Sequence, residues 1–244
     1  MNRNIPTFLL LLSFAVFAFC QSPKQPKVLV FSKTKGYYHT SIPDGIMAIQ
    51  KIGKESGFLV DTTTDATHFT DKVLKQYAAV VFLSTTGDVL DSVQEASFKR
   101  YINAGGGFMG VHAASDTEYD WGWYGQLVGG YFESHPETQK ATLEVVNPNH
   151  TSTRDLPKQW TRVDEWYNFK NLNPNMKVLL TIDETTYKGG KNGDYHPMAW
   201  YHELEGGRAF YTSLGHTKES YQDPLFLKHL TGGLLYVIGD KNDR

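Results

Sequence analysis

The sequence predicts an α/β domain built on a doubly wound, mostly parallel β-sheet, and two observations support this prediction. Three short apolar runs, at 27–32, 78–84 and 108–111, are continuous rather than alternating, as in parallel strands that are buried on both faces. Helix-like patterns separate these runs, so that strand and helix alternate along the chain. A chain of 244 residues with this alternation fits a single domain.

The N-terminus differs from the rest of the chain. Arg3 precedes a nearly uninterrupted apolar run at 8–19, and the chain then turns polar. A basic start, a short apolar segment and a polar exit predict a secretory signal over residues 1–20, because the run is too short to span a bilayer comfortably. A linker over 21–26 and one domain over 27–241 follow.

Cys20 at the end of this segment makes a lipoprotein signal the alternative to ordinary cleavage. The bulky Phe19 before it disfavours lipidation, because such signals usually place a small residue there. In both cases we expect an exported protein, either periplasmic or a membrane-anchored lipoprotein. A lipid on Cys20 would be its only contact with a membrane.

Charge and cysteine content exclude several functions. The formal net charge is −2 and the basic residues are scattered, which argues against nucleic acid as a partner. Cys20 is the only cysteine, so the domain has no disulfide, no thiolate metal site and no catalytic thiol. A nucleophile must be oxygen or nitrogen, and a metal would have to be held by histidine and carboxylate groups.

The remaining elements follow from periodicity and breakers along the chain. Helices are expected from Pro43, over 72–77, over 92–104, over 121–128 and over 225–238; further strands are expected at 58–62, 142–147, 177–183, 198–202 and 208–214.

His112 follows the central strand 108–111, which glycines bound on both sides. Gly110 before it and Ala113 and Ala114 after it leave room for a tight, strained turn, like the nucleophile elbow that presents a side chain above the carboxyl edge of a sheet. The alternative is a histidine that packs against or caps the turn. We interpret His112 as a candidate catalytic residue.

Two other histidines occupy equivalent places. His39 lies in the polar, aromatic loop after strand 27–32, and His216 follows strand 208–214 and a glycine. Ligands of open α/β sheets bind beyond the carboxyl ends of the strands, so both are candidate catalytic residues. Glu165 is the fourth, because a carboxylate among aromatic residues has its pKa raised towards the range of acid–base catalysis.

A second set of residues is predicted to bind the substrate. Aromatic faces stack on sugar rings but also fill cores, so these assignments carry a structural alternative. The set comprises Asp116, His135, Trp121, Trp166, Tyr167 and His196.

Six separated motifs make the chain resemble the ThuA-like family, which is named for a trehalose-utilisation protein. They are GYYHTSI (36–42), INAGGGFMGVHAASD (102–116), LVGGYFESHP (127–136), DEWYNF (164–169), HPMAWYHELEGGRAFYTSLGH (196–216) and DPLFLKHLTGGLLY (223–236). The resemblance implies a flavodoxin-like fold of the class I glutamine amidotransferase type and a context in carbohydrate catabolism. The amidotransferases carry a cysteine at the elbow where this chain has His112, so cysteine-based glutamine hydrolysis is excluded.

Two functions remain open from the sequence. The first is an exported carbohydrate-catabolic enzyme, a hydrolase, lyase or isomerase that acts on a sugar or keto-sugar derivative through His39, His112, Glu165 and His216. Histidine titrates near neutrality and can serve as acid or base, and the same four residues could hold a divalent cation such as zinc. The second is a non-catalytic carbohydrate-binding protein, which needs the aromatic residues but not the imidazoles. The oligomeric state is not predicted.

Overall fold

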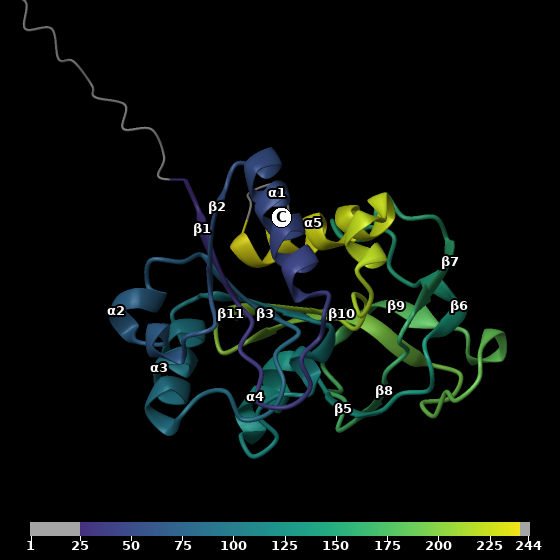
Figure 1. Cartoon of the computed structure of the whole chain (residues 1–244), viewed down its shortest axis with the longest axis horizontal. Coiled ribbons are helices and arrows are strands. Elements are labelled where there is room, and N and C mark those ends of the chain that lie inside the picture. Colours follow the sequence, from purple (N-terminus) through teal and green to yellow (C-terminus); the bar gives the residue numbers. More distant parts are fainter. Residues whose placement is uncertain (1–24, 240–244) are drawn as a thin grey trace, which may run out of the picture.

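The computed structural model describes residues 25–239, which form an α/β fold around one large twisted sheet (Figure 1). The nine strands of this sheet stand in the order β2-β1-β3-β4-β11-β10-β9-β6-β7. Their bounds are β1 Lys27–Phe31, β2 Leu59–Thr63, β3 Ala79–Leu83, β4 Gly107–Val111, β6 Gln139–Val145, β7 Gln159–Asp164, β9 Lys177–Ile182, β10 His196–Leu204 and β11 Gly207–Thr212.

The first five strands in spatial order, from β2 to β11, are mutually parallel. The order β2-β1-β3-β4 is that of flavodoxin-like sheets, in which ligands bind near the switch point between β1 and β3. Every residue of β3 and β4 is buried, as the continuous apolar runs predict. Each large apolar side chain buried there stabilises the fold by roughly 1.5–3 kcal/mol.

The remaining strands extend the sheet by antiparallel pairing. β10 pairs with β11 and β9, and β6 pairs with β9 and β7, so only β10 and β6 run against the other strands. A separate two-stranded sheet joins β5 (Tyr131–Ser134) and β8 (Asn168–Lys170). The predicted doubly wound, mostly parallel sheet with antiparallel additions in the second half is confirmed.

Helices cover both faces of the parallel half (Figure 1). α1 (Ile42–Ser56) and α5 (Pro224–Ile238) lie side by side on one face; α2 (Asp71–Leu74), α3 (Ser92–Asn103) and α4 (Gly122–Val128) lie on the other. Local chemistry fixes where the longer helices begin. Asp91 and Gln94 form a capping box at α3, and Asp223 caps α5 just before Pro224.

Because β1, β3, β4 and β11 are parallel, the loops that follow them all leave the sheet at the same edge. His39, His112 and His216 lie in three of these loops. The fold alone therefore brings together three histidines that are separated by up to 177 positions in the sequence, from 39 to 216.

Three strands have no counterpart in the sequence prediction: β5, β7 and β8. In β7 the inward positions are occupied by Trp160, Arg162 and Asp164, all buried. Arg162 pairs with Asp164 at 3.0 Å. Because two of its buried residues are charged, β7 has a polar sequence pattern although its inner face is covered. The predicted signal segment and most of the linker lie outside the described residues. No helix among residues 25–239 combines the length and apolar character needed to cross a bilayer.

Candidate functional site

His112 occupies a strained turn directly after β4. Its φ is +51°, in the left-handed region that non-glycine residues rarely adopt, and its residue is fully buried. Gly110 in β4 lets the Tyr211 ring pack close beside the turn, because a Cβ there would lie 2.9 Å from that ring. Tyr211 donates its hydroxyl hydrogen to the His112 carbonyl at 2.8 Å and holds the turn closed. The predicted elbow is present.

The imidazole of His112 has a defined orientation. Its Nδ1 lies 2.8 Å from the carbonyl oxygen of Ser213, at the end of β11. A carbonyl can only accept, so Nδ1 carries the hydrogen, and in the neutral ring Nε2 presents a lone pair. That lone pair is aimed at the other site residues.

His39 is held by the loop that connects β1 to α1. The Thr86 side chain, after β3, accepts the Gly36 backbone N–H and donates to the Tyr37 carbonyl. The His39 ring is nearly buried, and its Nε2 lies 3.2 Å from His112 Nε2. Its Nδ1 has no hydrogen-bond partner among the described residues.

His216 is positioned by a buried carboxylate that the sequence analysis did not single out. Asp164 accepts the backbone N–H groups of Gly215 and His216, each at 3.1 Å, and that of Glu165 at 3.0 Å. Asp164 thus joins the loop after β7 to the loop after β11. Neither Asp164 nor its partner Arg162 could be identified from the sequence, because charged residues that form a buried pair cannot be told from surface residues by their sequence pattern.

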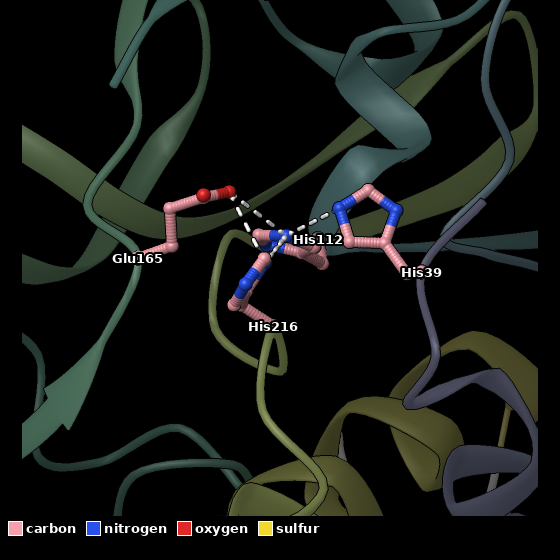
Figure 2. A group of neighbouring side chains, drawn as sticks. All are labelled: His39, His112, Glu165 and His216. Atoms are coloured by element: carbon pink, nitrogen blue, oxygen red, sulfur yellow. Dashed lines mark hydrogen bonds and ion pairs between the residues drawn. The ribbon is translucent and has the colours of Figure 1, made fainter. Parts of the chain in front are cut away.

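Glu165 completes the group that the four candidate catalytic residues form (Figure 2). Its Oε2 lies 3.5 Å from His112 Nε2 and 3.2 Å from His216 Nδ1, and His216 Nδ1 lies 3.2 Å from His112 Nε2. One atom from each of the four residues lies within 4.8 Å of all the others. We call His39, His112, Glu165 and His216 the His/Glu cluster.

The charges in the cluster are unequal. Burial and the neighbouring imidazoles of His112 and His216 lower the pKa of His39 to about 3, so its ring is neutral. Burial alone would raise the pKa of Glu165, as the sequence analysis expected, but its contacts with the imidazoles of His112 and His216 outweigh burial and lower the pKa below its usual value. Burial lowers the pKa of His216, but the hydrogen bond and the charge of Glu165 raise it by more, so that the pKa is raised overall. Glu165 is therefore the anionic centre.

A cleft of about 400 Å³ leads to the cluster from solvent, within the range of small-molecule sites. His135 stands at its edge, half exposed, with Nδ1 3.1 Å from Glu165 Oε1, the carboxylate oxygen that does not face His112. Asp116 lines the same cleft. The full lining comprises Tyr37, His39, Asp116, Phe132, His135, Glu137, Thr138, Glu165, Tyr167 and His216.

Three of the predicted substrate-binding residues lie outside this cleft. Trp166 is fully buried and donates its indole N–H to the Gln139 carbonyl, so it belongs to the core. Trp121 stacks on Trp123 at a centroid distance of 4.9 Å. His196 is fully buried and contacts the Tyr167 carbonyl from behind the site. None of the three can form a wall of the cleft.

The arrangement combines acid–base groups with a ligand set for a cation. Glu165 and His135 offer a carboxylate and an imidazole at the cleft, and the three cluster histidines offer nitrogen lone pairs. The four predicted catalytic residues are brought together, whereas of the six predicted substrate-binding residues only Asp116, His135 and Tyr167 line the cleft.

Comparisons with known proteins extend this description. The ThuA family model, described as trehalose utilisation, matches residues 27–237. No curated protein matches the chain significantly in sequence. A ThuA-like protein from Bacteroides uniformis is 23% identical, with a TM-score of 0.76 over 92% of this chain and 97% of that one. A ThuA-like protein from Parabacteroides merdae is 20% identical, with a TM-score of 0.74 over 89% of this chain and 91% of that one.

The fold also recurs inside larger proteins. A β-galactosidase from Rahnella sp. R3 is 15% identical, with a TM-score of 0.56 over 87% of this chain but only 31% of its own. At these identities the likeness concerns the fold alone.

Proposed function

The chain belongs to the ThuA family of trehalose-utilisation proteins, which indicates a carbohydrate-related role, and from this premise we propose that it is a carbohydrate-catabolic enzyme. It acts on a sugar or keto-sugar derivative as a hydrolase, lyase or isomerase. The His/Glu cluster is its reaction centre and holds a divalent cation such as zinc.

One observation carries the proposal: the spacing of the cluster's ligand atoms. In tetrahedral zinc sites with Zn–N bonds of 2.0–2.1 Å, neighbouring ligand atoms are about 3.3–3.4 Å apart. Of the six separations between the four ligand atoms, four are 3.2, 3.2, 3.2 and 3.5 Å, and all lie within 4.8 Å. Three imidazole nitrogens and one carboxylate oxygen are a ligand set that zinc accepts.

Hydrogen bonding alone accounts poorly for the same spacing. His112 Nε2 has one lone pair, yet four polar atoms lie within 3.5 Å of it, from His39, His216, Glu165 and Tyr167. At most one of them can donate to that lone pair. A cation at the centre would engage the lone pairs of all three histidines and the carboxylate. The Nδ1–H bond from His112 to Ser213 is also the kind of outer contact that orients a metal-binding histidine.

The cation would supply Lewis acidity towards a carbonyl or hydroxyl oxygen of the sugar. The chain's own groups supply the rest. Asp116, at the cleft, accepts hydrogen bonds from sugar hydroxyls. His135 is the exposed imidazole that exchanges protons with a bound sugar, and its contact with Glu165 Oε1 fixes the other oxygen towards the cluster.

A non-catalytic carbohydrate-binding protein is the alternative, and the placement of the aromatic residues argues against it. Trp121 and Trp166, which would stack on a glycan, lie outside the cleft. A protein that binds sugars only by aromatic stacking has no need for three converging imidazoles or for the strained backbone at His112. The discriminating change is His112→Asn, since Asn tolerates the left-handed backbone of this position. Turnover should vanish in an enzyme, while glycan affinity should persist in a binding protein.

Metal analysis of the purified protein tests the proposal directly. Protein purified without added metal, then exchanged against zinc, should hold one equivalent, and H112N and H216N should hold far less. His68→Asn is the matched control, because His68 lies outside the cleft and its imidazole hydrogen-bonds only to Thr63 and Asp65 among the described residues. Equal zinc content in wild type and H112N would refute the proposed metal site in the His/Glu cluster. Glucosides and 3-keto-glucosides are the first substrates to assay with the loaded protein.

We further propose that the protein is exported, on the basis of the basic start and the apolar run at 8–19. Fractionation of cells that express the full chain should place it in the periplasm or, if Cys20 is lipidated, in the membrane fraction. Cys20→Ser should then release it from the membrane. Uncleaved protein in the cytoplasm would contradict the proposal.

A further inference from the structure

Tyr167 places a hydroxyl group beside the His/Glu cluster, although the sequence suggested only a stacking surface. Its Oη lies 3.1 Å from His112 Nε2, the atom around which the other ligand atoms gather. The residue is almost fully buried but reaches the cleft with part of its side chain. Tyr167 thus contacts the cluster and also lines the cleft through which a ligand would enter.

The surroundings of Tyr167 fix the direction of this hydroxyl. The phenol ring packs against the His112 ring at a centroid distance of 4.5 Å and against Phe132 at 4.4 Å. Its backbone carbonyl accepts a hydrogen bond from His196 Nε2 at 2.8 Å, and Nδ1 of the same ring lies 2.8 Å from Glu184. His196 is therefore a positioning residue for Tyr167, which explains its burial behind the site.

A cation in the cluster changes what the Tyr167 hydroxyl can do. Without one, the hydroxyl can donate to the lone pair of His112 Nε2; with one, that lone pair is engaged. No other acceptor for this hydroxyl is found within residues 25–239. A buried donor without an acceptor is destabilising, so the hydroxyl is available to donate to an oxygen that enters through the cleft.

We propose that Tyr167 is a catalytic residue whose hydroxyl donates a hydrogen bond to the substrate oxygen that approaches the cluster. This assignment rests on the proposed function and identifies the kind of atom that the site recognises: a carbonyl or hydroxyl oxygen of the sugar. If negative charge develops on that oxygen, a fixed donor at this place stabilises the transition state more than the ground state.

Cobalt(II) and acetate test the assignment without knowledge of the substrate. Wild type and Tyr167→Phe are loaded with Co²⁺, and sodium acetate is titrated while the visible absorption of the cobalt is recorded. Both proteins should take up one equivalent of Co²⁺, and acetate should bind at least about tenfold more weakly to Y167F, because hydrogen bonds to charged acceptors are among the stronger ones. Tyr195→Phe, at an exposed tyrosine outside the cleft, is the matched control and should behave as wild type.

Each other outcome overturns a defined part of the argument. Equal acetate affinity in wild type and Y167F refutes the donor role of Tyr167 alone. Loss of Co²⁺ uptake in Y167F refutes it in another way, because Tyr167 would then be a ligand. Co²⁺ uptake by wild type without any response to acetate means that no oxygen can join the site, which also refutes it. No Co²⁺ uptake by wild type refutes the cation centre of the proposed function, and the assignment with it.

Discussion

The carboxylate of Asp164 accepts the backbone N–H of His216 at 3.1 Å and thereby joins the end of β7 to the loop after β11. The same carboxylate pairs with Arg162 at 3.0 Å in a fully buried environment. It therefore links the stability of the antiparallel half to the geometry of the His/Glu cluster.

Replacement of Asp164 by Asn should damage both properties. The amide would present hydrogens to groups that are themselves donors at Oδ2, among them Gly215 N–H and the Arg162 guanidinium. Removal of one partner of a buried ion pair costs about 3–5 kcal/mol, and loss of support for a metal ligand costs about 10–100-fold in metal affinity. Urea denaturation and Co²⁺ titration measure the two effects.

Asp223→Asn is the control for this experiment. Asp223 contacts the same Arg162 at 3.4 Å and caps α5, but it is partly exposed, and Asn caps a helix equally well. We expect it to lose about 1 kcal/mol or less and to keep its metal affinity. If D164N were as mild as D223N, Asp164 would not position the cluster.

Zinc should stabilise the folded protein, because the cluster brings its four ligands together only in the folded state. At a free concentration of one hundred times Kd, the free energy of unfolding should rise by about 2.7 kcal/mol. For a domain of this size the melting temperature should rise by about 5–10 °C, and a chelator should reverse the rise. The H216N variant should show little of it; the same rise in H216N would place the ion elsewhere.

The pH dependence of stability should report on two histidines outside the cluster, His150 and His229. His229 is fully buried under β11, and its Nδ1 donates to the Ser152 carbonyl at 3.0 Å. Burial, together with the nearby His150 and the charge of Arg162, lowers its pKa to about 3. Burial and the nearby charge of Arg154 likewise lower the pKa of His150 to about 4.

Because the folded state binds these protons less readily than the unfolded state, stability falls as the pH drops below about 6.5. The loss continues until the pH reaches the pKa of the folded state. For His229 it should amount to about 2–3 kcal/mol between pH 6.5 and pH 4.5, measured by urea denaturation. His229→Asn keeps an N–H for Ser152 and takes up no proton there, so its stability should depend less on pH. An unchanged pH dependence would show that His229 is not the group responsible.

Most of the parallel half could be predicted from the sequence, because strands that are buried on both faces must be continuous apolar runs. The alternation of side chains along an extended chain explains where the site prediction succeeded and where it failed. Glu165 and Tyr167 are two residues apart in an extended segment and both reach the cleft, whereas Trp166 between them points into the core. Sequence reasoning grouped the three by composition, and only the alternation of side chains separates them.

The location of the histidines was predictable for a different reason. Parallel strands deliver their following loops to a single edge, so His39, His112 and His216 had to lie near one another once the strand order was known. The contribution of Glu165 was less determined, because it follows β7 at the far end of the sheet order. Its approach depends on Asp164 and Arg162, a buried ion pair that no hydrophobic pattern reveals.

The strained backbone at His112 should reverse the usual order of stability of Ala and Gly variants at this position. In most places Gly destabilises a fold by about 0.5–1 kcal/mol relative to Ala, because it loses more backbone entropy. At a φ of +51° an Ala pays about 1–2 kcal/mol that Gly avoids. Both variants lack the imidazole, so H112G should unfold at a higher urea concentration than H112A. The same pair of changes at Lys51, exposed in the middle of α1, should show the ordinary order with Ala more stable. If Ala were also the more stable residue at position 112, the turn would be relaxed, and the backbone at His112 would not be held in place against strain by Tyr211 and its neighbours.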